Sequence, residues 1–345
     1  MPDRDAVFPE RLAVPPLRSG GIMLGYQCNL SCRHCNYRCR PGAGEWMEED
    51  MLELILDTLA GEQKLIDIHL SGGEATLNRD LLELAVARCR DKKIRLSYLE
   101  TNGFFAGSVD SALKVFLPLK KAGLNAVLVS VSPYHNEKIP LRHTLNCLEA
   151  GVEVFGHDGV FPWLAHFIPM LARLDPETPH SLEEFMDANH IRPDDGSLLR
   201  LFPLTPGGRV PDALRGLFRP QPAENFRVGH CLDILTGVDH FHIDPDGNLF
   251  TGHCPGIVAA RVPDLHHEKE LERDPVFVNL ALGGPHALME TARRLYRFAP
   301  DETGYISPCD LCLKVRGVLA ANDPEAWPEL GPATFYPECP RGTVA

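Results

Sequence analysis

The sequence lacks the features that mark membrane-bound, secreted or nucleic-acid-binding proteins. No stretch approaches the roughly 18 consecutive apolar residues that a membrane span needs. Residues 1–19 carry proline and acidic residues where a signal peptide has an apolar core. The 34 Lys and Arg are outnumbered by 47 Asp and Glu, for a net charge of −13. This balance disfavours a polyanionic partner, because phosphate binding needs clustered Lys and Arg. We therefore expect a cytoplasmic protein that binds neither membranes nor nucleic acids.

Two further absences limit the kinds of enzyme and of fold that the sequence can specify. The 15 histidines show no HExxH spacing, so a mononuclear zinc hydrolase finds no support. The sequence also has no internal repeat. It does contain 11 cysteines, an odd number. Because cytoplasmic thiols stay reduced, clustered cysteines indicate metal binding or redox chemistry more than a disulfide framework.

Short apolar runs rich in β-branched residues alternate with helical patterns from residue 20 to about residue 206. In the first helical pattern Met51, Leu54, Ile55, Thr58 and Leu59 recur at three- and four-residue steps, which predicts one buried face. Apolar strands separated by helices predict a parallel sheet. About six β/α units fall short of the eight in a closed barrel, so we predict an α/β fold, a partial (β/α)6 barrel. The predicted strand runs are 20–27, 66–73, 94–103, 126–133, 163–170 and 198–206.

The composition changes after residue 206. Prolines and glycines gather in a predicted linker, and residues 241–252 predict a β-hairpin around the turn Asp244–Gly247. A polar helical stretch near 264–298 and the CxxC in 307–312 complete a small hairpin-plus-helix domain. The predicted divisions are an N-terminal extension (1–19), a core domain (20–210), a linker (211–226), a cysteine-bearing domain (227–320) and a proline-rich tail (321–345).

Three cysteines follow the first predicted strand, with three and then two residues between them. Cys28, Cys32 and Cys35 stand in a loop at the carboxyl end of a strand, where parallel α/β proteins build their sites. Thiolates select zinc, copper(I) or iron–sulfur clusters. Three thiolates with an open fourth position would also suit a catalytic zinc. The spacing alone leaves these metals open.

This CxxxCxxC resembles the motif of the radical S-adenosylmethionine enzymes, and other motifs of that family follow in order. Gly72, Gly73 and Glu74 end the second predicted strand and match the family's GGE motif, which binds the methionyl amino group. The third and fourth strands end in ETNG and VSVSP, where the family offers polar side chains to the cofactor. Those side chains are Glu100, Asn102, Ser130 and Ser132. The resemblance covers about residues 20–210.

The resemblance implies a [4Fe–4S] cluster on the three cysteines, with one iron open for S-adenosylmethionine. Electron transfer would cleave that cofactor to a 5′-deoxyadenosyl radical, which abstracts a substrate hydrogen. Structural alternatives are a glycine turn at the second strand end and strand-end capping by Ser130 and Ser132, which share one face. Catalytic candidates are Cys39, Tyr134 and His135, for which a structural thiol and a solvated loop are the alternatives.

Four more cysteines flank the predicted hairpin: Cys231, Cys254, Cys309 and Cys312. Four thiolates suit a closed zinc site or a fully ligated iron–sulfur cluster. Their arrangement resembles the twitch domain of some radical S-adenosylmethionine enzymes, which binds one auxiliary [4Fe–4S] cluster. The longer SPASM version needs more cysteines than the five beyond residue 200, so one auxiliary cluster is implied. Cys339 is the fifth of these, either a replacement ligand or a bystander.

These resemblances imply a radical S-adenosylmethionine oxidoreductase with two [4Fe–4S] clusters, of which the auxiliary one would aid either oxidation or substrate binding. Its partners would be a peptide or small-molecule substrate and an electron donor such as flavodoxin or ferredoxin. Peptide or protein modification is the favoured activity. The barrel begins near residue 20 without a recognisable peptide-leader domain, which keeps a small-molecule dehydrogenase or biosynthetic enzyme as an alternative. A further alternative is a non-catalytic metal-binding or electron-carrying protein, for which the SGGE and VSVSP motifs would be accidental.

Overall fold

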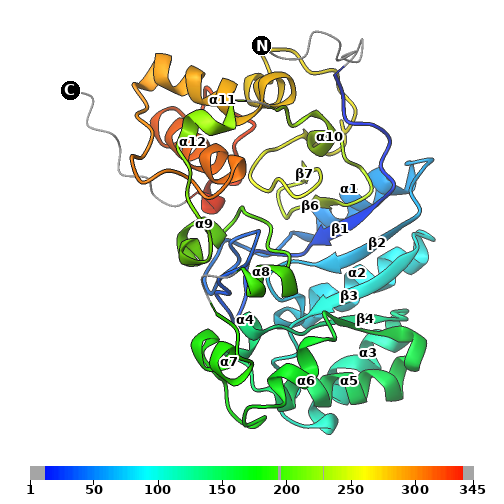
Figure 1. Ribbon diagram of the computed structural model, residues 1–345. Coiled ribbons are helices and arrows are strands. Elements are labelled where there is room, and N and C mark those ends of the chain that lie inside the picture. Colours follow the sequence, from blue (N-terminus) through cyan, green and yellow to red (C-terminus); the bar gives the residue numbers. More distant parts are fainter. Residues whose placement is uncertain (1–11, 193–195, 228, 337–345) are drawn as a thin grey trace. The chain divides into compact units, whose positions relative to one another are not determined.

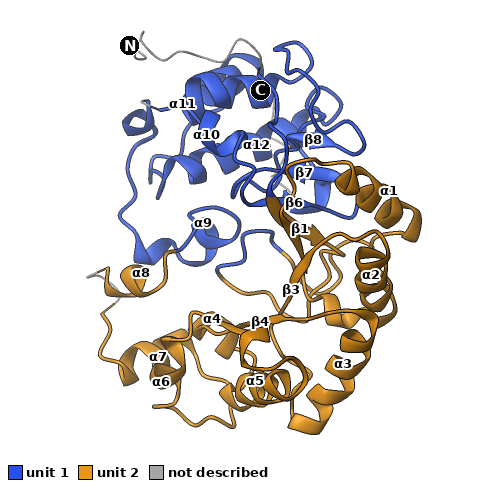
Figure 2. Cartoon of the chain, turned by 90° about the vertical axis from the view of Figure 1, so that its right-hand side faces the viewer, with its two compact units in different colours: residues 1–18, 34–38, 204–345 blue, residues 19–33, 39–203 orange. Residues whose placement is uncertain are grey.

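The structure is a computed structural model that describes residues 12–192, 196–227 and 229–336 (Figure 1). These residues form two compact units (Figure 2). Unit 2 comprises residues 19–33 and 39–203, and the described residues of unit 1 lie within 1–18, 34–38 and 204–345. The stretch 34–38, inside the predicted core domain, thus groups with the C-terminal part of the chain.

Unit 2 is built on five parallel strands. They are β1 (Ser19–Met23), β2 (Asp67–Ser71), β3 (Leu96–Thr101), β4 (Val127–Ser130) and β5 (Val160–Trp163). Each strand pairs with the next in sequence order, as β–α–β crossovers of one hand produce. Within the described ranges β5 is an edge strand, so the sheet stays open. The predicted α/β class and the unclosed sheet are confirmed.

Four helices cover one face of this sheet (Figures 1 and 2). They are α1 (Glu49–Ala60), α2 (Arg79–Asp91), α3 (Val109–Ala122) and α5 (Leu141–Phe155). The buried face of α1 is formed by Leu52, Ile55, Leu56 and Leu59, whereas Leu54 is 38% exposed. The predicted buried face is therefore rotated about the helix axis relative to the observed one, because apolar residues recur at helical spacing along two neighbouring faces of this helix.

Two predicted strand runs differ from the structure. The run 163–170 is half turn or strand end and half helix, because β5 ends at Trp163 and α6 (Phe167–Leu171) begins after a three-residue turn. The run 198–206 contains α8 (Ser197–Leu201) and no strand. Its prolines, Pro203 and Pro206, lack the N–H that a central strand donates. Short helices α4 (Pro133–Asn136) and α7 (Leu182–Ala188) complete unit 2.

Unit 1 combines a small antiparallel sheet with two longer helices. β6 (Phe241–Ile243) and β7 (Asn248–Phe250) form the predicted hairpin. Its turn needs Gly247, whose φ is +74°. β8 (Ala260–Arg261) extends the sheet beyond β7. The helices are α9 (Val210–Ala213), α10 (Leu232–Leu235), α11 (Pro275–Tyr296) and α12 (Pro308–Asn322), and α11 packs on α12.

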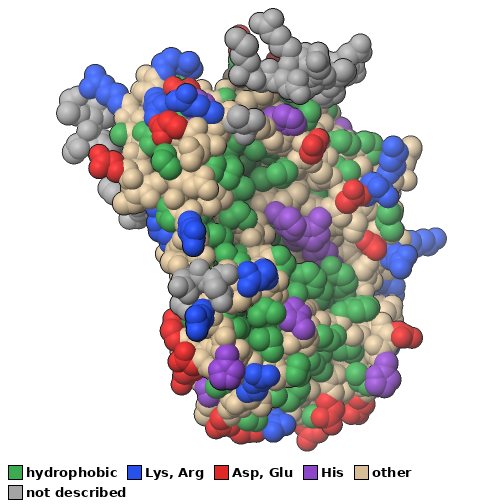
Figure 3. All heavy atoms as spheres, in the orientation of Figure 1, with side chains coloured by type: hydrophobic (Ala, Val, Ile, Leu, Met, Phe, Trp, Pro, Cys, Tyr) green, Lys and Arg blue, Asp and Glu red, His purple; other side chains and the backbone are tan. Residues whose placement is uncertain are grey.

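On the face that Figure 3 shows, Lys and Arg side chains are scattered among acidic and apolar ones rather than gathered into one patch. No helix within the described ranges is both long and apolar enough to cross a membrane.

Candidate functional site

The loop after β1 carries the first two cysteines of the CxxxCxxC motif. The Cys28 amide donates to Arg40 O at 3.2 Å, and the Arg40 amide donates to Tyr26 O at 3.3 Å, so this loop is closed by backbone hydrogen bonds. Cys28 is 8% exposed and Cys32 is half-buried. The Leu30 amide donates to Cys28 Sγ at 3.3 Å. Amide-to-sulfur hydrogen bonds of this kind tune thiolate ligands of iron–sulfur clusters.

Cys35, the third cysteine, belongs to the segment 34–38 of unit 1. Its carbonyl accepts from the Arg209 amide at 3.1 Å and the Arg38 amide at 3.4 Å. Gly208 has φ +53°, and a Cβ there would overlap Cys35 O. Gly208, which lies two residues after the run 198–206, thus lets the chain approach the third cysteine closely. Because two residues separate Cys32 from Cys35, the chain keeps their Cα atoms within about 11 Å of each other.

Gly72 and Gly73 of the GGE motif pack against the loop that carries Cys28. A Cβ on Gly73 would overlap Gln27 O and lie 2.9 Å from Cys28 Cβ. A Cβ on Gly72, at φ +142°, would lie 2.7 Å from another backbone oxygen of this loop. The Glu74 amide donates to Gln27 O at 2.9 Å. Both glycines are therefore required by the approach of the second strand end to the cysteine loop.

The Glu74 side chain is a buried hub at these strand ends. Its Oε1 accepts from the hydroxyls of Thr76 at 2.6 Å and Thr101 at 2.8 Å, and its Oε2 accepts from the Asn102 amide at 2.7 Å. Burial raises the pKa of Glu74, and these hydrogen bonds oppose the rise. The carboxylate ties the end of β2 to the end of β3, and Oε2 retains a second lone pair.

Asn102 connects this hub to the cysteine loop. Its Nδ2 donates to Asn29 Oδ1 at 2.9 Å and lies 4.0 Å from Cys28 Sγ. Its Oδ1 accepts from the Phe104 amide at 3.0 Å. The side chain is 6% exposed. Asn102 therefore positions the loop of Cys28, and its contact with a cofactor stays a prediction.

The face of the sheet opposite the four helices carries polar and aromatic side chains. The rings of His69 and Tyr98 stack at 5.0 Å, and Tyr98 meets Phe161 edge-on at 6.5 Å. Phe161 and Trp163 are 45% and 53% exposed. Glu100 Oε1 lies 3.7 Å from His69 Nε2. Burial and a neighbouring carboxylate raise the pKa of Glu100 to about 7. This face offers apolar rings and one titratable carboxyl to a ligand.

The end of β4 places the predicted serines and two catalytic candidates. Ser130 is half-buried, whereas Ser132 is buried and caps α4, with its Oγ 2.7 Å from His135 Nδ1. Burial lowers the pKa of His135 to about 4, so the imidazole is neutral at physiological pH. Tyr134 is buried and packs edge-on against Phe202 at 5.1 Å. Catalytic roles for Tyr134 and His135 stay predictions.

Two cysteines stand outside the sets of three and four. Cys39 is 3% exposed and directly precedes Arg40, whose backbone closes the first loop. This burial favours the structural alternative for Cys39. Cys339 lies outside the described residues.

The second set of cysteines lines one cavity of unit 1, with a volume of about 240 Å³. Cys231 precedes α10, Cys254 follows β7, and Cys309 and Cys312 lie in the first turns of α12. The structure thus brings together four residues that are far apart in sequence. A water takes about 30 Å³ of liquid volume, so this cavity has room for a group of several atoms. Across the described ranges, no three Cys, His, Asp or Glu side chains converge on the position of one metal ion.

The cavity is electrostatically unfavourable for bare thiolates. Burial raises the pKa of Cys231 to about 12 and that of Cys309 to about 11. It also raises the pKa values of Cys254 and Cys312. The Arg316 guanidinium works against each of these rises. A bound metal centre would supply the remaining positive charge, since metal ligation deprotonates thiols.

Arg316 is a buried cation at this cavity. It is 6% exposed, and its Nη1 donates to Pro255 O at 3.0 Å and to the Tyr336 hydroxyl at 2.9 Å. Its Nε has no hydrogen-bond partner, and no described carboxylate forms an ion pair with it. Because a buried charge needs a counter-charge, an anionic centre in the cavity fits this donor set. A cluster ligated by four thiolates is such a centre.

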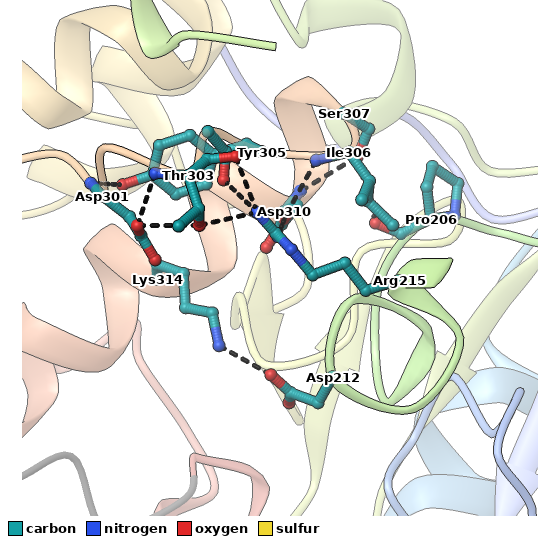
Figure 4. Close-up of polar contacts among 11 residues, drawn as sticks. Pro206, Asp212, Arg215, Asp301, Thr303, Tyr305, Ile306, Ser307, Asp310 and Lys314 are labelled. Carbon is teal, nitrogen blue, oxygen red and sulfur yellow. Dashed lines mark hydrogen bonds and ion pairs between the residues drawn. The ribbon is translucent and has the colours of Figure 1, made fainter. Parts of the chain in front are cut away.

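A polar network holds the CxxC at the start of α12 (Figure 4). Ser307 caps the helix: its Oγ accepts from the Asp310 amide at 3.0 Å and donates to Pro206 O at 3.2 Å. The buried Asp310 carboxylate accepts from the Ile306 amide at 2.9 Å and faces Arg215 at 3.5 Å. Since Asp310 lies between the two cysteines of the CxxC, this network fixes where both thiols stand.

Comparison with known families fits this arrangement. Residues 22–188 match the radical SAM superfamily. The chain contains a radical SAM domain. The matched range includes the CxxxCxxC and GGE motifs and the ends of β3 and β4. The radical SAM family implies a [4Fe–4S] cluster, S-adenosylmethionine and enzymatic activity, so the resemblance stated from the sequence is confirmed.

Individual relatives are distant. “Putative peptide biosynthesis protein YydG” of Bacillus subtilis (strain 168) is 25% identical over 169 residues, which are 48% of this chain and 50% of that protein. GTP 3′,8-cyclase of Paenarthrobacter nicotinovorans is 29% identical over 171 residues, 47% of this chain and 45% of that protein. The match thus spans about half the length of these relatives. The crystal structure of BtrN in complex with AdoMet and 2-DOIA aligns with a TM-score of 0.43 and 14% identity, covering 79% of this chain and 90% of that one.

Sequence reasoning missed several residues that shape the radical SAM domain and the second cavity. The hydroxyls of Thr76 and Thr101 donate to the Glu74 hub, and Asn29 Oδ1 accepts a hydrogen bond from Asn102 Nδ2. Thr76 could have been found from the sequence, because it places a hydroxyl side chain two residues after Glu74 of the GGE motif. For Arg316 the signal was its position four residues after Cys312, one helical turn along α12.

Proposed function

We propose that this chain is a radical SAM oxidoreductase with a catalytic [4Fe–4S] cluster on Cys28, Cys32 and Cys35 and an auxiliary [4Fe–4S] cluster in the four-cysteine cavity. When bound, the catalytic cluster and S-adenosylmethionine supply a 5′-deoxyadenosyl radical that takes a hydrogen atom from the substrate. The observation that carries the proposal is the second set of four cysteines, gathered on one cavity beside an unneutralised arginine. The chain also carries a radical SAM domain.

The residues of unit 2 that bind S-adenosylmethionine are those at the strand ends. Glu74 Oε2 has a lone pair free to receive the methionyl ammonium. Gly72 and Gly73 bring their backbone against the loop of Cys28, where the cofactor would sit. Glu100, Asn102, Ser130 and Ser132 offer polar groups from β3 and β4.

Four ligands for the auxiliary cluster leave none of its irons open, so this cluster accepts an electron rather than binding substrate. In the proposed reaction a substrate C–H would give its hydrogen atom to the 5′-deoxyadenosyl radical, which would become 5′-deoxyadenosine. The substrate radical would then lose a proton to solvent and one electron, for which a centre held by the four cysteines would be the acceptor, and the substrate would undergo a net two-electron oxidation. An electron carrier such as flavodoxin or ferredoxin, in the reducing cytoplasm, exchanges electrons with both clusters.

We infer peptide or protein modification as the activity. The exposed rings of Phe161 and Trp163, on the sheet face opposite the four helices, suit a flexible substrate with apolar side chains. In addition, the relative YydG is named as a peptide biosynthesis protein. A small-molecule substrate is the second candidate, because other relatives are named for a nucleotide substrate.

Anaerobic incubation of the iron-loaded chain with reductant and S-adenosylmethionine tests the proposal. We expect 5′-deoxyadenosine from the unaltered chain and none from Cys28→Ala, Cys32→Ala or Cys35→Ala. Cys309→Ala should spare cofactor cleavage more than product formation. Persistent cleavage in the Cys28, Cys32 and Cys35 variants would refute their role. Equal loss of both activities in Cys309→Ala would refute a separate auxiliary role.

A further inference from the structure

Arg316 is held rigidly beside the four-cysteine cavity that it lines. The Tyr336 hydroxyl accepts from its Nη1 and donates in turn to a backbone carbonyl. The Arg316 guanidinium lies over the Tyr336 ring, 5.6 Å from its centroid. Helix α12 places Arg316 four residues after Cys312 and seven after Cys309, one and two turns along the same helix face. The charge therefore has a fixed place relative to the two thiols of the CxxC.

Among the described residues that line this cavity, Arg316 is the only one with a permanent charge. The nearby Asp310 carries the opposite charge, but its carboxylate does not line the cavity. It accepts from the Ile306 amide and pairs with Arg215 instead. Asp310 opposes Arg316 at Cys309, but it acts there more weakly than Arg316 does, so the field of Arg316 inside the cavity is not cancelled.

We propose that Arg316 raises the reduction potential of the metal centre held by the four cysteines, which makes this centre an acceptor for the electron of the substrate radical. The inference rests on the auxiliary cluster of the proposed function. One-electron reduction adds a negative charge to a centre that is already anionic. A fixed cation stabilises the reduced form more than the oxidised form, and this interaction is several-fold stronger in a buried site than in water.

The test measures the potential of the auxiliary centre alone. In a full chain with Cys28, Cys32 and Cys35 changed to Ala, iron loading leaves only that centre, so no activity is needed. An anaerobic titration with dithionite, followed by electron paramagnetic resonance, gives its midpoint potential. Arg316→Gln and Arg316→Met remove the charge, Arg316→Lys keeps it, and Arg294→Gln removes a charge from the exposed surface of α11.

We expect each neutral variant at Arg316 to shift the reduction equilibrium at least tenfold toward the oxidised form, about 59 mV for a one-electron step. Arg316→Lys should retain most of the potential, and Arg294→Gln all of it. A neutral variant that loads iron and has the midpoint of Arg294→Gln would overturn the inference. Two neutral variants are made, one polar and one apolar, because a single neutral variant that loads iron is enough for the test.

Iron loading makes the remaining outcomes decisive. If both neutral variants fail to hold iron while Arg316→Lys holds it, the charge itself retains the anionic centre, which supports the electrostatic coupling. If Arg316→Lys also fails, the shape of the guanidinium matters and not its charge, and the inference is wrong. If the Arg294→Gln control holds no iron–sulfur centre either, the auxiliary cluster of the proposed function is refuted, and this inference with it.

Discussion

Changing Gly73 to Ala should displace the loop that carries Cys28. The added methyl would overlap Gln27 O and lie 2.9 Å from Cys28 Cβ. Gln27 O is a backbone atom that also accepts from the Glu74 amide, so it cannot rotate away. Overpacking costs 1–3 kcal/mol, and a clash with backbone belongs at the upper end, about 3 kcal/mol. For a unit of this size that cost lowers Tm by about 6–12 °C.

Thermal unfolding of the metal-free chain, followed by tryptophan fluorescence, measures this effect. Trp46 and Trp163 both lie in unit 2, so the signal is dominated by the unit that contains Gly73. Gly107→Ala, in the same unit, is the matched control, because its Cβ would meet its nearest atoms, in His143, at an ordinary contact distance of 3.8 Å. Equal Tm values for Gly73→Ala and Gly107→Ala would refute the argument that the GGE glycines serve close approach to the cysteine loop.

Three further predictions concern the strand ends and the CxxC helix. Glu74→Gln turns one acceptor of the buried hub into a donor that faces an amide or a hydroxyl. It should lower the free energy of unfolding by about 1–3 kcal/mol, measured as a lower midpoint of urea unfolding. An unchanged midpoint would contradict the role of Glu74 as a hydrogen-bonded hub. Ser307→Ala removes the cap of α12 and should lower the free energy of unfolding by about 1 kcal/mol, and a variant as stable as the unaltered chain would contradict the cap. Glu100 has a folded-state pKa raised to about 7, so its contribution to stability is fully present below its unfolded value near 4.5 and is lost as pH rises to 7. The stability of the unaltered chain relative to Glu100→Gln should therefore fall between pH 4.5 and 7, and a constant difference would rule out the raised pKa.

Motifs that depend on a few neighbouring residues were predictable from the sequence. The ends of β1 to β4, the hairpin at Gly247 and the CxxxCxxC loop follow from strand composition, turn chemistry and thiol spacing. These features are local, so tertiary packing had little to override. The radical SAM resemblance rested on such motifs in a fixed order, and the match over residues 22–188 confirmed it.

Features set by packing could not be predicted in this way. The apolar run 198–206 was predicted as a sixth strand, but its prolines cannot donate to a ladder and Gly208 instead packs against Cys35. The predicted buried face of α1 was rotated relative to the observed one, because apolar residues lie on two faces of this helix. The role of Arg316 depends on a cavity formed by segments far apart in sequence, and no single stretch indicates it.

The central claim is that one chain holds two iron–sulfur clusters on separate cysteine sets. Iron and sulfide analysis with Mössbauer spectroscopy after anaerobic loading tests it most directly. We expect about eight irons in the unaltered chain, about four when Cys28, Cys32 and Cys35 are changed to Ala, and about four when Cys309 and Cys312 are changed to Ala. About four irons in the unaltered chain, unchanged by the loss of Cys309 and Cys312, would contradict the account, as would zinc in place of iron.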